Sequence, residues 1–296
     1  MSFHLINNRG LLLCLLAASF FMSCRKDDSA NPPDNEPRLI MKFKFDSTQV
    51  RLNSQGLPAS VPSNHGAQSP RFNQMSAHYI ELTPNQFTGI GGGDVLYRAT
   101  ETNIGGSNAI DFSKSNPTGD GQEFFSIPIK DITPGNYEWL RVSLAYQNYD
   151  IDFRYTLNGN YFDLSGTIAS FIGFNTFLSE FQIKDSIISV NANKLQGYWA
   201  FETPYRVFQG QSAGTTTVPN PIFTTSPIPA GSCLVTGRFD NTLTITGNEV
   251  NDVIVTVSLS TNKSFEWVEN SSLGYFEPAD GDSVVDMGIR GMRIIY

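Results

Sequence analysis

Residues 149–165, YDIDFRYTLNGNYFDLS, contain the clearest structural signal in the chain. The dipeptide Asn158-Gly159 lies between two segments rich in aromatic residues, and Asn-Gly strongly favours the tight turn of a β-hairpin. Aromatic and β-branched residues on both sides suit the pleated surface of a sheet. The sequence therefore predicts an antiparallel hairpin with strands at 150–157 and 159–165.

Similar patterns continue on both sides of this hairpin. Residues 39–46 alternate, with Met41, Phe43 and Phe45 on one face, which is typical of a half-buried strand. Turn-forming residues at 133–136 and 246–248 separate other candidate segments. Further strands are predicted at 77–83, 94–99, 122–130, 137–147, 167–174, 180–191, 197–203, 233–246, 250–260, 264–268 and 283–295.

The remaining segments contain little regular pattern. Residues 53–74 predict a long loop, and only 174–182 fits one or two helical turns. The fold prediction is all-β, an antiparallel β-sandwich (Ig-like or jelly-roll-like) with long loops, formed by one domain over 38–296. The Pro/Thr-rich stretch 212–231 is the best candidate for an extended loop or a boundary.

The N-terminus contains a secretion signal. Arg9 precedes an apolar run of about a dozen residues, too short for the roughly 20 that span a bilayer, so residues 1–23 predict a signal peptide. The segment ending at Ser23-Cys24 resembles a bacterial lipoprotein signal, which implies cleavage before Cys24 and attachment of acyl chains such as palmitate to it. The alternative is ordinary signal-peptidase cleavage with Cys24 incidental.

The residues after Cys24 indicate where the anchored protein is displayed. Residues 24–37 have almost no apolar side chains and predict a flexible tether. Lys26, Asp27 and Asp28 resemble the lipoprotein export signal of Bacteroidota, which implies the outer leaflet of the outer membrane, facing the cell exterior. Multiple acyl chains give a firm membrane anchor. The alternative is a solvated charge cluster.

The net charge of −8 becomes −9 when residues 1–23, with Arg9, are removed. An acidic chain without a basic patch argues against nucleic acid as a partner. With Cys24 lipidated, Cys233 has no partner for a disulfide and is predicted to be a small buried residue.

Several short segments resemble the MbnP-like family of β-sandwich proteins, which is named after a protein encoded beside copper-peptide genes. They are Phe45-Asp46, Tyr79–Leu82, the 129–137 strand–turn–strand segment, 195–201 and Gln209-Gly210. The resemblance implies a β-sandwich and a role in handling copper. The family's Trp-rich stretch is absent, Trp199 is the only Trp nearby, and the His expected near 215–235 is missing, so the family's copper chemistry is not carried over.

Two sets of residues are candidate metal ligands. His65, Met75 and His78 offer imidazole and thioether groups that suit copper, although each histidine also fits a structural role. Asp280, Asp282 and Asp286, with Glu277, offer oxygen ligands for calcium, although acids in a solvated turn are the alternative. No other cofactor is indicated.

The catalytic patterns are incomplete. The 210–214 segment matches G-x-S-x-G, but no histidine follows Ser212. Asp150 and Asp152 share a strand face, which is the minimum for an enzyme acting on polysaccharide. The sequence therefore predicts that the protein is not an enzyme.

Residues 146–181 are dense in aromatic side chains, which either fill the core or bind a ligand. Tyr149, Tyr155 and Tyr161 are the candidates to present a polar tip at the surface. The sequence thus favours a surface-anchored, non-catalytic binding module for a glycan, a nutrient or a partner protein of an uptake complex. A copper-handling protein and a polysaccharide-acting enzyme are the alternatives.

Overall fold

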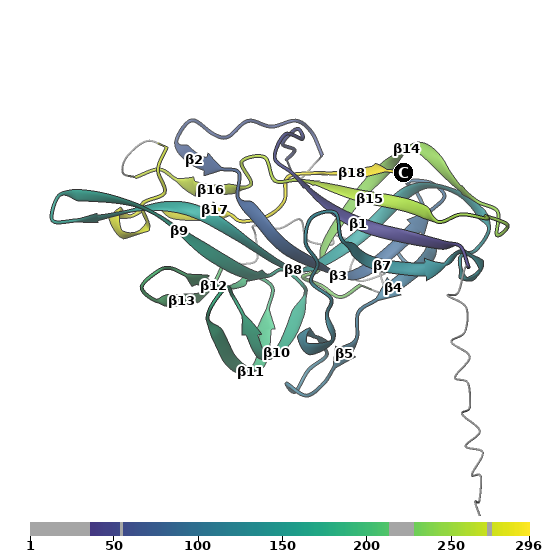
Figure 1. Ribbon diagram of the computed structural model, residues 1–296, viewed down its shortest axis with the longest axis horizontal. Helices are drawn as coiled ribbons and strands as arrows, with labels where there is room; N and C mark the ends of the chain where they lie inside the picture. The colour runs from purple at the N-terminus through teal and green to yellow at the C-terminus, as the bar shows by residue number, and fades with distance from the viewer. Residues whose placement is uncertain (1–35, 54–55, 213–227, 271–273) are drawn as a thin grey trace, which may run out of the picture. The chain divides into compact units, whose positions relative to one another are not determined.

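The computed structural model describes residues 36–53, 56–212, 228–270 and 274–296. Glu36–Tyr296 forms one compact unit built almost entirely of strands (Figure 1), so the predicted all-β, sandwich-like fold is confirmed. Within the described residues, no helix is long and apolar enough to cross a membrane. The predicted signal peptide, Cys24, Lys26, Asp27, Asp28 and most of the loop at 212–231 lie outside these residues.

The elements follow each other along the chain with three short 3-10 turns among them. They are β1 (Arg38–Asp46), β2 (His65–Gln68), β3 (Arg71–Thr83), β4 (Asp94–Arg98), β5 (Glu101–Thr102), β6 (Ala109–Asp111), η1 (Phe112–Lys114), β7 (Glu123–Pro128), η2 (Ile129–Asp131), β8 (Gly135–Leu157), β9 (Asn160–Phe171), β10 (Asn175–Gln182), β11 (Ile187–Leu195), β12 (Tyr198–Glu202), β13 (Val207–Gln211), β14 (Cys233–Ile245), β15 (Val253–Ser260), β16 (Phe265–Val268), η3 (Pro278–Asp280), β17 (Ser283–Asp286) and β18 (Met292–Ile295).

The 23-residue strand β8 organises the fold. It belongs to an 11-stranded sheet of order β13-β12-β9-β8-β14-β18-β15-β1-β7, in which β3 also pairs with β8 and β4 with β3. Its first half pairs with β14 and its second half with β9. A four-stranded sheet, β11-β10-β6-β5, and a three-stranded sheet, β17-β16-β2, complete the described structure.

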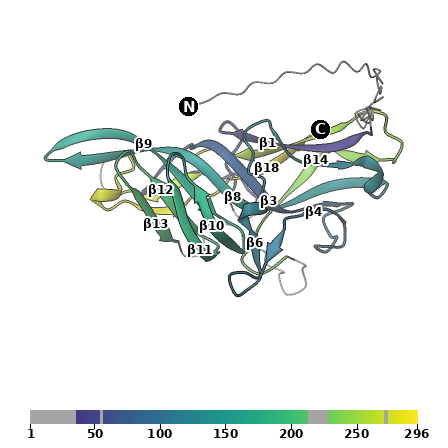
Figure 2. The same cartoon turned by 60° about the horizontal axis from the view of Figure 1, so that its bottom comes forward.

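The middle of β8, up to Tyr149, is covered on both faces. Tyr149, Ile151 and Phe153 point to one face and pack, with Ile168 of β9, against Phe265 and other residues near β16 and η3. The opposite face packs against β10 and β11, which lie close to β12 and β13 (Figure 2). Because successive strand residues point to opposite faces, residues 146–149 are buried on both faces, whereas beyond Tyr149 only the face of Ile151 and Phe153 is buried.

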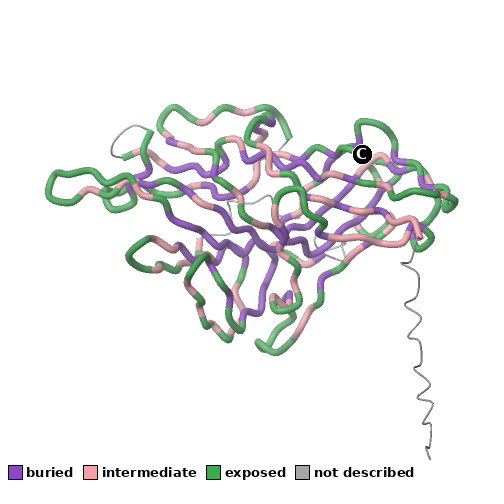
Figure 3. The backbone as a smooth tube through the Cα atoms, in the orientation of Figure 1, coloured by how far each residue is buried: buried purple, intermediate pink, exposed green. Residues whose placement is uncertain are grey.

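The burial pattern changes towards the tip of the β8–β9 hairpin. Figure 3 shows buried residues concentrated along the central strands and exposed residues at the far end of this hairpin. The turn has the predicted geometry, because Asn158 and Gly159 both have positive φ, 52° and 78°. Two central residues with positive φ match the twist of a two-residue hairpin.

Three strand pairs are parallel, which the predicted antiparallel sandwich did not include. They are β1 with β15, β14 with β18, and β6 with β10. Strand β18 pairs parallel with β14 and antiparallel with β15, so it lies inside the main sheet between them. Parallel neighbours need a long connection between them, and local sequence does not reveal which distant strands meet.

Several local predictions were wrong, among them the following three. The predicted helical turns at 174–182 are strand β10, in which a bulge between Leu178 and Glu180 interrupts the alternation. Phe177, Leu178 and Phe181 are consequently all buried, and this spacing resembles that of a helix. The predicted loop at 53–74 contains β2 and the start of β3, and the predicted strand at 283–295 is two strands, β17 and β18.

Candidate functional site

The candidate site begins where the β8–β9 hairpin extends beyond the layer that covers it. Phe153, Tyr155 and Leu157 follow Tyr149 and Ile151 on the same face of β8, because their positions differ by two. On β9, Phe162 pairs with Tyr155, and Leu164 pairs with Phe153. The buried apolar face thus continues outward as a surface of aromatic and aliphatic side chains.

The β12–β13 hairpin forms a second wall. Phe201 pairs with Phe208, and the rings stack with their centroids 6.4 Å apart. Thr203 fixes the connecting turn. Its Oγ1 accepts hydrogen bonds from the main-chain N–H groups of Tyr205 and Arg206, at 3.3 and 3.2 Å, and donates to the Arg206 carbonyl at 2.9 Å. The turn residues therefore have a fixed backbone.

The segment around η3 forms a third wall through Pro278 and Ala279. The Asp282 carboxylate accepts from the main-chain N–H groups of Glu277 and Asn270, at 2.7 and 2.9 Å. A carboxylate that accepts main-chain N–H groups in this way holds a loop in one conformation. Asp282, a predicted calcium ligand, thus orders this wall of the groove.

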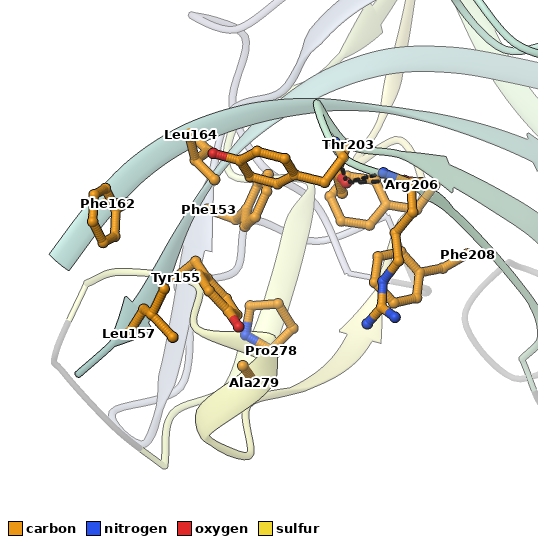
Figure 4. Close-up of a pocket in the computed structure, with 12 residues that line it drawn as sticks. Phe153, Tyr155, Leu157, Phe162, Leu164, Thr203, Arg206, Phe208, Pro278 and Ala279 are labelled. Carbon is orange, nitrogen blue, oxygen red and sulfur yellow. Dashed lines mark hydrogen bonds between the residues drawn. The ribbon is translucent and has the colours of Figure 1, made fainter. Parts of the chain in front are cut away.

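The three walls enclose a groove of about 710 Å³. Phe153 lies at its base and packs edge-to-face on Phe201, with ring centroids 5.4 Å apart. Figure 4 shows Tyr155 and Pro278 next to each other, with Arg206 and Phe208 on the side of the β12–β13 turn. The described lining residues are Phe153, Tyr155, Leu157, Phe162, Leu164, Phe201, Thr203, Tyr205, Arg206, Phe208, Pro278 and Ala279.

Large apolar side chains in this groove remain exposed to solvent. The exposed fraction is 77% for Tyr205, 39% for Tyr155 and 38% for Phe208. Leu157 and Phe162 are also exposed. A concave, mainly apolar surface with a few polar groups is the usual form of a ligand site, and its volume lies in the usual range of roughly 300–1,000 Å³.

Arg206 is the only charged residue among the described lining residues. Its guanidinium carbon lies 4.2 Å from the centroid of the Phe208 ring, within the range of a cation–π contact. The hydroxyl groups of Tyr155, Thr203 and Tyr205 supply the other polar side-chain atoms of the groove.

The reverse face of the β8–β9 hairpin holds it in place. Arg154 forms a bidentate ion pair with Asp163, at 2.7 and 3.0 Å, and its guanidinium carbon lies 3.3 Å from the Tyr275 ring centroid. The hydrogen bonds from Arg154 hold the pKa of Asp163 below its usual value. The Arg154 main-chain N–H also donates to the Phe276 carbonyl at 2.8 Å. These contacts join the hairpin to the segment that leads into η3.

The three tyrosines predicted to bind a ligand lie in three different environments. Tyr155 lines the groove, as predicted for a surface residue. Tyr161 is 63% exposed but lies on the reverse face, where it pairs with Thr156. The prediction for Tyr149 was wrong. Tyr149 is fully buried, because β16 and η3 cover its part of β8, and its hydroxyl donates to the Met287 carbonyl at 3.2 Å.

The predicted copper residues have separate surroundings. His78 is fully buried, its Nε2 lies 3.0 Å from Glu101 Oε1, and its ring packs on Phe174. The hydrogen bond with His78 is the main cause that lowers the pKa of Glu101 to about 2. Met75 is buried in the main hydrophobic core, and His65 contacts a different carboxylate, that of Glu266.

Glu266 is the centre of a buried charged cluster that also contains one predicted calcium ligand. Its Oε2 contacts Arg51 and lies 2.9 Å from Arg290, and its Oε1 contacts His65. Arg290 also pairs with Asp286 at 2.6 Å. Burial raises the pKa of Asp286 to about 6.

The predicted calcium residues do not form one site. Asp286 faces Arg290, whereas Asp282 accepts main-chain N–H groups, and Asp280 donates its own main-chain N–H to the Glu277 carbonyl at 3.0 Å. Within the described ranges, no group of three or more His, Cys, Asp or Glu residues has an arrangement that could hold a metal ion.

Asp150 and Asp152 were the candidate carboxylate pair of a polysaccharide-acting enzyme. Both form their contacts outside the groove. Asp152 forms a bidentate pair with Arg71 at 2.9 and 3.0 Å and accepts from Ser165 at 2.6 Å. Asp150 accepts from Thr167 at 2.6 Å.

Sequence reasoning missed most of the groove. The alternation of Phe153, Tyr155 and Leu157 could have predicted that these three residues share one face of the strand. The contributions of 203–208 and of Pro278 had no such signal, because they depend on contacts between segments roughly 40 residues or more apart in the sequence.

Comparison with known proteins finds no matching family model, no similar curated protein and no similar solved structure. The resemblances to lipoprotein signals and to the MbnP-like family therefore stay predictions from the sequence.

Proposed function

We propose that this protein is a lipoprotein anchored through Cys24 in the outer membrane, displayed at the cell surface, and that it binds an extracellular ligand without catalysing a reaction. The observation that carries the proposal is the aromatic groove between the β8–β9 and β12–β13 hairpins. The N-terminal sequence supports the location, and the groove supports the binding role.

The groove has the properties of a binding surface rather than those of a poorly packed part of the hydrophobic core. Its walls are fixed by the Thr203 turn, the Arg154 contacts and the Asp282 hydrogen bonds. Aromatic rings that stay exposed on a fixed backbone lose little entropy when a ligand packs on them. Single exposed apolar residues need no explanation, but a contiguous concave patch of them marks an interaction site.

The ligand is expected to present an apolar face to these rings, as a sugar ring or an apolar nutrient does. A partner protein of an uptake complex is the third class of ligand, after a glycan and an apolar nutrient, since a protein partner also inserts apolar side chains into such grooves. The copper-handling role gains no specific support, because His65 and His78 contact different carboxylates.

The test is a binding screen of the chain from Glu36 onward, which contains every described element, against glycan arrays, small nutrients and envelope proteins. The ligand that the wild-type chain retains is then measured against the double variant Tyr205→Ser, Phe208→Ser. We expect affinity to fall at least about tenfold, since two exposed rings are lost. The matched control is Phe87→Ser, which removes an exposed ring outside the groove.

Equal affinity of the double variant and the wild type for the retained ligand would place binding outside the groove and contradict the proposal. Loss of affinity in Phe87→Ser as well as in the double variant would also contradict it, because the effect would then not be specific to the groove.

A further inference from the structure

The charge of the groove suggests what the ligand carries. The chain has a net charge of −8, yet no carboxylate occurs among the groove's described lining residues. The one charged group is the guanidinium of Arg206. The described lining residues therefore carry one positive charge and no negative charge, which suits an anionic group of the ligand.

Arg206 differs from the other arginines of the described ranges in its surroundings. Arg38 hydrogen-bonds to Ser126, and the others each form an ion pair with an acidic side chain. No ion pair to Arg206 occurs within the described residues, where its guanidinium contacts the ring of Phe208. This guanidinium thus retains its hydrogen-bond donors for another group.

We propose that the groove binds an amphipathic carboxylate: Arg206 pairs with the carboxylate, and the aromatic walls receive the apolar part of the ligand. The inference rests on the proposed function, because it names the chemical class of the ligand that the groove takes.

The geometry of the guanidinium favours a carboxylate. Its planar fork presents two parallel N–H groups that match the two oxygens of a carboxylate, which makes the pair bidentate. The ring of Phe208 covers one face of the guanidinium and removes part of its hydration.

The backbone at Arg206 is already organised for this contact. Its N–H donates to Thr203 Oγ1, and its carbonyl accepts from both the N–H and the hydroxyl of Thr203, at 3.0 and 2.9 Å. Only the side chain has to be ordered when an anion binds, which reduces the entropy cost of binding.

The remainder of the groove fits an apolar body next to the anion. Tyr155, Leu157, Phe162 and Leu164 of the β8–β9 hairpin present a continuous surface of rings and methyl groups. This surface takes the alkyl chain of a fatty acid, the ring of an aromatic acid or the apolar face of a uronic acid in a glycan. The three sources share one chemistry, a carboxylate attached to an apolar face.

The experiment compares each acid with a neutral counterpart of the same shape. Isothermal titration of the chain from Glu36 onward uses dodecanoate and dodecanol, 3-phenylpropionate and its amide, and a tri-galacturonate and its methyl ester. We expect at least one acid to bind more tightly than its neutral counterpart, by about tenfold or more. The pair that shows the preference identifies the source of the carboxylate.

Arg206→Gln keeps hydrogen-bond donors but removes the charge. We expect the ratio of the affinity for the acid to the affinity for its neutral counterpart to fall to about one in this variant. Arg238→Gln, at an exposed arginine of β14, is the matched control and should keep the preference.

Each other outcome overturns the inference. Equal binding of acid and neutral counterpart to the wild type, with loss of both in Tyr205→Ser, Phe208→Ser, rejects the carboxylate and leaves the proposed function intact. A preference that survives in Arg206→Gln rejects Arg206 as the anion site. Binding of none of the six probes, while the screen yields a different groove ligand, rejects the carboxylate class. Absence of any groove ligand rejects both proposals.

Discussion

Replacing Glu266 by Gln tests whether His65 has a structural role in the charged cluster rather than a role in metal binding. The Glu266 carboxylate contacts His65, Arg51 and Arg290, and the exposed fractions of the Glu266 and Arg51 side chains are 6% and 8%. The substitution keeps the shape of the side chain. It removes the negative charge and one acceptor oxygen, which leaves the buried guanidinium of Arg51 and the half-buried one of Arg290 with Asp286 as the remaining carboxylate of the cluster.

The expected cost follows from this arrangement. Breaking a buried ion pair by neutralising one partner costs about 3–5 kcal/mol, because the other charge stays buried without compensation. Asp286 continues to pair with Arg290 at 2.6 Å, so the lower end of this range applies. For a domain of this size, ~3 kcal/mol corresponds to a fall in Tm of roughly 6–12 °C.

The assay is thermal unfolding followed by circular dichroism at pH 7, in the presence of a chelator and again with added copper. Glu180→Gln, which neutralises an exposed carboxylate on β10, is the control and should change stability by less than about 0.5 kcal/mol. A Glu266→Gln variant as stable as the wild type would refute the structural reading of the cluster. A copper-dependent rise in Tm that requires His65 would instead favour a metal site.

Three other predictions concern the anchor, the hairpin and the histidine–glutamate pair. Cys24→Ala should abolish labelling with radioactive palmitate, and replacing Lys26–Asp28 by alanines should keep the label but remove the protein from the cell surface, as measured by protease accessibility on intact cells. Arg154→Ala should weaken ligand binding in the groove and speed hydrogen exchange in the β8–β9 hairpin, because it removes the contacts with Asp163 and Tyr275. For Glu101, whose pKa is lowered to about 2 mainly by the hydrogen bond with His78, the carboxylate stabilises the fold above pH 4.5 and this stabilisation is lost as the pH falls towards 2. The Tm difference between wild type and Glu101→Gln should therefore shrink over that pH range.

Each of these expectations has a contrary result. Palmitate label retained in Cys24→Ala would show that another residue carries the lipid. Unchanged hydrogen exchange in Arg154→Ala would mean that the hairpin is held by its strand pairing alone. A constant Tm difference between pH 7 and pH 2 would show that the Glu101 charge does not contribute to stability.

The local parts of the fold were accessible from the sequence. Asn158-Gly159 specified the hairpin and its turn, and alternation in 39–46 specified β1, because these signals depend only on neighbouring residues. The burial of Tyr149 was not accessible, because the residues near β16 and η3 that cover this face of β8 lie more than 100 residues away in the sequence. The bulge in β10 likewise altered the alternation on which the prediction at 174–182 depended.

The groove shows the same limit at the level of function. Tyr155 was a candidate from its aromatic surroundings, but the residues opposite it come from a turn near Arg206 and from η3. Their proximity results from packing between β8, β12 and the segment after β16, which pairwise periodicity in one sequence does not encode. Aromatic density therefore located one wall of the site, and the tertiary structure was needed for the other two.

The most direct test of the central claim is hydroxyl-radical footprinting of the chain with and without the ligand that the binding screen retains. If the groove is the binding site, oxidation of Tyr155, Tyr205 and Phe208 should fall on addition of ligand, while Phe87 and Tyr161 should be oxidised at unchanged rates. Protection of Phe87 or Tyr161 with no change at the three groove residues would contradict the claim.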